Sequence, residues 1–184
     1  MTQPIELTPS RAVIDPDTPS WLRPLAWAVL QLNRLMVAIG MVALIAAAFV
    51  LTSSVVSRYV MHASTDWQDE TAVFLLVGAT FLCGAYVQSL RGHVGIEALT
   101  GVLPAGVNRV RQVLVDVISF CFCLFFAWKS WTLFHEAWVD NQTTSSSWAP
   151  PLSIPYGLMA FGMSLLAVQI ALQITSGLNR VRRG

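Results

Sequence analysis

The stretch WQDETAVFLLVGATFLCGAYVQSLRGHVGIE, residues 67–97, decides the fold. It begins with the acidic pair Asp69 and Glu70, continues through the uncharged residues 71–90, and meets its next charge at Arg91. An apolar run of this length matches the thickness of the hydrocarbon core of a bilayer. The stretch therefore predicts a transmembrane helix with charged residues at both ends.

Composition places the rest of the chain in the same class. Of its 184 residues, 55% are hydrophobic and 11% are charged, and the mean hydropathy is +0.60. Because an average soluble domain carries roughly 25% charged residues, most soluble globular classes are excluded. The net charge of +1 gives no sign of a nucleic-acid partner.

Hydropathy predicts four transmembrane spans, at residues 35–57, 71–90, 113–138 and 152–174. A short amphipathic helix in the membrane interface is predicted at residues 96–107. Residues 21–34 fit either a second interfacial helix or the start of the first span. Residues 1–20 lack the pattern of a signal peptide and are predicted to be a mobile tail. The expected fold is thus an all-α integral membrane protein, with residues 21–184 forming one four-span domain plus interfacial helices.

Basic residues flank these spans unevenly. Four spans place nine arginines on one side of the membrane: Arg11, Arg23, Arg34, Arg91, Arg109, Arg111, Arg180, Arg182 and Arg183. Arg58 and Lys129 belong to the other side. Because cytoplasmic ends of membrane spans carry the excess of Lys and Arg, both termini and the residue 1–20 tail are predicted to be cytoplasmic.

The second span is predicted to begin with a helix cap. Thr65 and Gln68 have the spacing of a capping box. Asp66 and Asp69 lie where the helix dipole favours negative charge, and we expect Asp69 to be solvated there.

Glu70 lies directly before the apolar run and is the acidic residue that we expect to point into protein. A charged group at a membrane edge is a candidate functional residue. Arg58 or Lys129 is its hypothetical partner.

No pattern of a catalytic site is present in the sequence. Four spans place His62 and His135 near one membrane face and His93 near the other, so they cannot share a haem or a metal ion. The three cysteines lie inside apolar runs and are predicted to be small buried hydrophobes: Cys83, Cys121 and Cys123. We therefore predict that the chain is not an enzyme and holds no cofactor.

The third predicted span differs from the others in its side chains. It carries Asp116, Lys129 and His135, and its aromatic residues lie on all sides of the helix, so some of them must face lipid or another protein. The only proline inside a span is Pro155, near the start of the fourth. Because moving carriers are typically built on broken helices, this pattern favours a rigid scaffold.

Several short motifs occur in a fixed order along the chain. Small residues at Gly84 and Ala85, beside Tyr86, are expected to permit close helix contact. Two glycines in the segment from Arg91 through His93 to Glu97 permit a sharp turn. The full series is Trp67-x-x-Glu70, Gly84-Ala85-Tyr86, Gly92-His93-Val94-x-Ile96-Glu97 and Trp148 followed by Ile154-Pro155-Tyr156.

This series resembles the small membrane subunit (DctQ-like) of TRAP transporters, the tripartite ATP-independent periplasmic transporters. The resemblance covers roughly residues 30–175, and Glu97 stands where the family usually has Asp. It implies a non-catalytic subunit in the bacterial inner membrane that scaffolds a large membrane transport subunit and helps a periplasmic solute-binding protein to dock. It also implies a carboxylate-bearing solute and symport driven by sodium, with sodium bound at the large subunit. The structural or partner-contact residues expected from these motifs are Trp67, Glu70, Gly84, Tyr86, Arg91, His93, Glu97 and Pro155.

Two other functions are alternatives to this one. A small homodimeric transporter would need an acidic residue in the middle of the membrane, and no predicted span has one at its centre. A four-helix membrane redox protein would need facing histidines or cysteine pairs in loops, and both are missing from the sequence.

Overall fold

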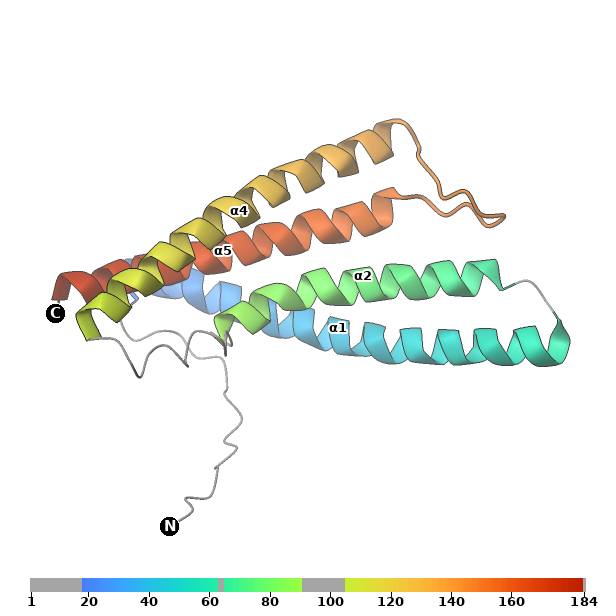
Figure 1. Cartoon of the computed structure of the whole chain (residues 1–184), viewed down its shortest axis with the longest axis horizontal. Helices are drawn as coiled ribbons and strands as arrows, with labels where there is room; N and C mark the ends of the chain where they lie inside the picture. Colours follow the sequence, from blue (N-terminus) through green and yellow to red (C-terminus); the bar gives the residue numbers. More distant parts are fainter. Residues whose placement is uncertain (1–17, 63–64, 91–104, 184) are drawn as a thin grey trace, which may run out of the picture.

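The computed structural model describes residues 18–62, 65–90 and 105–183, and these residues are almost entirely helical (Figure 1). A 3₁₀ turn, η1 (Ser20–Leu22), leads into α1 (Arg23–Val56), which ends in a π-helical segment, η2 (Ser57–Met61). The other helices are α2 (Asp66–Ser89), α4 (Ala105–Val139) and α5 (Ser153–Arg183). All four α-helices are long and apolar enough to span a membrane. The predicted fold class, an all-α protein with four candidate spans, is therefore confirmed.

The four helices form an open row (Figure 1). Helix α4 packs on α5, α5 packs on α2, and α2 packs on α1, so α5 and α2 are the inner helices. The start of α1 and the end of α5 lie at one end of the row, and the connections from α1 to α2 and from α4 to α5 lie at the other. We call the second of these the loop end.

Helix α5 links two apolar clusters. One joins Val29 and Met36 of α1 with Leu82 of α2 and Leu165 of α5. The other joins Cys123 of α4 with Ile170 of α5 and their neighbours. Since lipid tails are as apolar as these side chains, close packing rather than exclusion of water holds such helices together.

Two glycines set the closest approaches between helices. A Cβ atom on Gly162 would lie 2.6 Å from the carbonyl carbon of Phe81, so α5 and α2 touch backbone to backbone. A Cβ atom on Gly40 would overlap the Sγ of Cys83, which fixes the approach of α1 to α2. By contrast, a Cβ atom on Gly84 would meet nothing within 4 Å. Gly84 therefore makes no close contact with another helix of this chain, although its neighbour Ala85 is fully buried, and its role as a partner contact stays a prediction.

The amino-terminal part of the chain matches one of the two alternatives predicted for residues 21–34, the start of the first span. Residues 21–34 form no separate interfacial helix, because α1 runs without a break from Arg23 to Val56. At 1.5 Å per residue this helix is roughly 50 Å long, which exceeds the hydrocarbon core of about 30 Å. Thr18, predicted to lie in a mobile tail, is buried, and its hydroxyl lies 3.1 Å from that of Ser176 in α5. The predicted interfacial helix at 96–107 lies outside the described residues except for its last part, which belongs to α4.

The cysteines follow the prediction only in part. Cys123 is buried and Cys83 is half-buried, but Cys121 is exposed. Positions two apart on a helix point in different directions, so Cys121 and Cys123 cannot both face α5.

Candidate functional site

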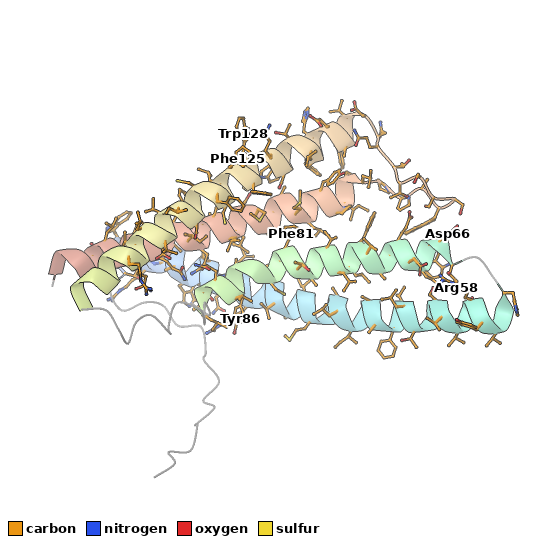
Figure 2. All side chains as sticks on the ribbon, viewed as in Figure 1. Arg58, Asp66, Phe81, Tyr86, Phe125 and Trp128 are labelled. Carbon is orange, nitrogen blue, oxygen red and sulfur yellow. The ribbon has the colours of Figure 1, made fainter. Side chains whose placement is uncertain are left out.

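Polar side chains gather in two places inside the helix row, one at the loop end and one near the opposite end. At the loop end, Asp69 of α2 accepts hydrogen bonds from Ser54 Oγ (2.9 Å) and Arg58 Nη2 (2.9 Å). The Arg58 guanidinium also donates to Thr65 Oγ1 at 2.8 Å. We call these four residues the Asp69 cluster; Figure 2 labels Arg58, in η2, near Asp66, where α2 begins.

The Asp69 cluster corrects two predictions. The carboxylate that meets Arg58 belongs to Asp69, whose side chain is still 48% exposed, and not to Glu70. Glu70 has no ion-pair partner among the described residues, and its Oε2 is buried without a hydrogen bond. Thr65 does occupy the N-cap position, but its side chain makes no cap hydrogen bond, so no capping box forms.

The connection from α4 to α5 is folded against itself at the same end. The backbone N–H groups of Leu152 and Thr144 donate to the carbonyls of Gln142 (2.9 Å) and Pro150 (3.1 Å). Ser147 Oγ in this connection donates to Asp66 Oδ2 at 2.8 Å, which ties it to the start of α2. The loop end therefore presents one connected polar surface rather than two separate loops.

The second polar group is a set of buried amides near the opposite end. Asn33 Nδ2 of α1 donates to Gln169 Oε1 of α5 at 2.9 Å. Gln88 Nε2 of α2 donates to Gln173 Oε1, and Gln173 Nε2 returns a hydrogen bond to the backbone carbonyl of Gln88, both at 2.8 Å. Gln169 and Gln173 are one turn apart on α5, so one face of α5 holds both α1 and α2.

None of these amides was singled out from the sequence. A single Asn or Gln in an apolar run has no signature of its own, and its partners lie 85 or more residues away. The spacing of Gln169, Gln173 and Ser176 at one-turn intervals was the available signal.

The described residues contain no group of three or more His, Cys, Asp or Glu side chains that could hold a metal ion. The amides and the Asp69 cluster use their polar atoms to join helices. This arrangement suits a structural role, in which hydrogen bonds connect the spans to one another.

The predicted site residues are scattered. Trp67 is half exposed at the start of α2, Tyr86 is half-buried near its end, and Pro155 is buried in the first turn of α5. Figure 2 places Tyr86 far from Arg58 and Asp66, at the other end of α2. Arg91, His93 and Glu97 lie outside the described residues, so their expected roles stay predictions.

Comparison with known families gives one finding. The family model described as "Tripartite ATP-independent periplasmic transporters, DctQ component" matches residues 47–180. The match contains α2, the Asp69 cluster, α4 and nearly all of α5. Neither a search of curated proteins nor a search of solved structures finds a match.

Proposed function

Because the chain belongs to the DctQ component of TRAP transporters, and is thus the small, non-catalytic, multi-pass membrane subunit of such a system, we propose that it works as a rigid scaffold for the large transport subunit. Membership in the family implies a large membrane subunit and a periplasmic binding protein as partners. In our proposal the large subunit moves a carboxylate-bearing solute with a sodium gradient, and this chain transports nothing itself.

The observation that carries the scaffold proposal is the continuity of the helices. Within the described residues, α1, α2, α4 and α5 run through their spans without a break, and the π-helical segment lies at the end of α1. Transporter gates typically use helices that are unwound near the middle of the membrane. Inter-helix hydrogen bonds from Asn33 and Gln88 add to this rigidity.

We further propose that the loop end faces the periplasm and helps the binding protein to dock. Nine of the eleven Lys and Arg residues then lie toward the cytoplasm, as the positive-inside rule requires. The docking surface would comprise the connection from α4 to α5 and the Asp69 cluster. Its internal hydrogen bonds support a preformed surface.

Reconstitution in liposomes tests the proposal. The large subunit and the binding protein are reconstituted with and without this chain, and uptake of radiolabelled solute is measured with an inward sodium gradient. We expect uptake only when all three proteins are present, and none from this chain alone. Uptake by this chain alone would support the homodimeric carrier instead, and full uptake without this chain would contradict the scaffold role.

A further inference from the structure

Lys129 is a charged residue with an unusual position inside a span. It belongs to the span Arg111–Val139 of α4 and its side chain is exposed. Its Nζ lies 5.4 Å from the ring centroid of Trp128, and within the described part of the chain no carboxylate is within ion-pair distance of it. A charge in the hydrocarbon region is costly unless it pairs or reaches water, so Lys129 needs either an anionic partner or a path to the membrane surface.

The nearer membrane surface is a poor source of that partner. Lys129 is ten residues from Val139, roughly 15 Å along the helix, and seven from Glu136, the first acidic residue in that direction, roughly 10 Å. The Cα–Cβ bond of a helical residue tilts toward the helix amino terminus. For Lys129 this direction leads away from the nearer membrane surface. The side chain would therefore have to turn back along the helix to reach the lipid headgroups there.

The surroundings of Lys129 form a continuous exposed face. Ile118, Phe122 and Phe125 precede it at spacings of three or four residues, and they are 61%, 61% and 53% exposed. The opposite side of α4 packs on α5 through Cys123 and Ala127. Figure 2 shows the Phe125 and Trp128 side chains on the side of α4 that is turned away from α5.

Helix α1, at the other edge of the row, provides a contrast. Its exposed side chains include Val42, Ile45 and Phe49, which are 67%, 59% and 73% exposed. The sequence has no charged residue between Arg34 and Arg58. A face without charge suits lipid, whereas the face of α4 combines aromatic residues with one lysine that has no counter-ion among the described residues.

We propose that the face of α4 formed by Ile118, Phe122, Phe125 and Lys129 is the contact with the large membrane subunit, and that Lys129 pairs with a carboxylate of that subunit inside the membrane. This inference rests on the proposed function, and it adds the helix, the face and the charge through which the two subunits meet. Buried charge pairs fix the register of an interface, and removing one member leaves the other charge unpaired.

Site-specific photo-crosslinking tests the location of the contact. A benzophenone analogue of phenylalanine replaces either Phe125 on α4 or Phe49 on α1, two exposed phenylalanines at opposite edges of the row. In membranes containing the large subunit, we expect irradiation to give a crosslinked product with that subunit from position 125 and not from position 49. The reverse pattern, or a product of two copies of this chain from position 125, would overturn the inference.

Substitution of Lys129 tests the charge. We expect Lys129→Leu to lower recovery of the large subunit with the tagged chain at least tenfold, while Lys129→Arg keeps most of it. Equal recovery with Lys129→Leu would show that Lys129 faces lipid and would overturn the ion pair. Failure of the unaltered chain to recover the large subunit would instead contradict the proposed function, so the two failures are distinguishable.

Discussion

The Asp69 carboxylate accepts hydrogen bonds from two side chains that differ greatly in solvent exposure. Its partner Ser54 is 2% exposed, whereas the side chain of its other partner, Arg58, is 59% exposed. An ion pair in water contributes about 0–1 kcal/mol to stability, while a hydrogen bond from a buried group to a charged one contributes about 1.5–3 kcal/mol. The serine contact therefore matters more than the salt bridge.

Double-mutant cycles check this ranking. We expect the coupling free energy between Ser54→Ala and Asp69→Ala to be about 1 kcal/mol or more, and that between Arg58→Ala and Asp69→Ala to be smaller. Equilibrium unfolding of the four variants of each cycle in detergent measures both values. A larger coupling for the arginine pair would contradict the ranking.

Which of the two neighbouring acids, Asp69 or Glu70, meets Arg58 could not be predicted from the sequence. The sequence identified an acidic helix start and an arginine in the preceding segment, and the structure pairs them. Neighbouring positions on a helix point about 100° apart, so the rotation of α2 about its axis decides which acid meets Arg58. That rotation depends on packing against α1, which hydropathy does not report.

At the scale of whole helices, contact between α2 and α5 depends on the absence of one side chain. Gly162 lies against the backbone of Phe81, which cannot move as a flexible side chain can. Gly84 lies on the same α2 helix as Phe81 but faces open space within the chain. The two glycines are therefore a matched pair for testing the packing.

We expect Gly162→Ala to lower the free energy of unfolding by about 1–3 kcal/mol, because the added methyl group forces α2 and α5 apart. Gly84→Ala should leave it unchanged or slightly higher, since alanine favours helix and meets no neighbour. Thermal unfolding of both variants in the same detergent compares them. Equal loss of stability in the two variants would contradict the close backbone contact at Gly162.

The four spans were predictable because apolar length alone specifies them, and each predicted range lies almost entirely within an observed helix. The continuation of α1 toward Arg23 was not predictable, because Trp and Arg near a membrane surface fit both an interfacial helix and the solvated end of a transmembrane span. The order of the row was not predictable either. Alanine occurs in every span and glycine in three of the four, and only three-dimensional packing shows that Gly40 and Gly162 lie at contacts between helices while Gly84 does not.

At the scale of the whole molecule, charge is divided between the two ends. The segments 58–70 and 135–152 at the loop end carry five carboxylates and one arginine: Asp66, Asp69, Glu70, Glu136, Asp140 and Arg58. The other end has the arginine-rich segments that predict a cytoplasmic location.

This division predicts how the binding protein docks. If the acidic loop end contributes to the docking surface, binding should weaken as salt rises from about 0.05 to 0.5 M, because ions screen exposed charges. Surface plasmon resonance with the complete membrane complex measures the affinity, and Asp140→Asn combined with Glu136→Gln should reduce its salt dependence. Affinity that is independent of salt would contradict an electrostatic contribution from this surface.

The same division predicts the orientation in the membrane. A cysteine-reactive probe that cannot cross membranes should label a cysteine placed at Ser145, in the α4–α5 connection, from outside intact spheroplasts, provided the native cysteines are replaced. A cysteine added after Gly184 should react only after the cells are opened. Labelling of the carboxyl terminus in intact spheroplasts would contradict the predicted orientation.

In the proposed function, this chain is an obligatory structural partner of a larger transport protein. Affinity purification of the tagged chain from its native membrane in mild detergent, followed by native mass spectrometry, measures whether the two proteins form a complex. We expect a complex with one much larger multi-pass membrane protein at equal stoichiometry. Recovery of the chain alone, or only with copies of itself, would contradict the proposed function.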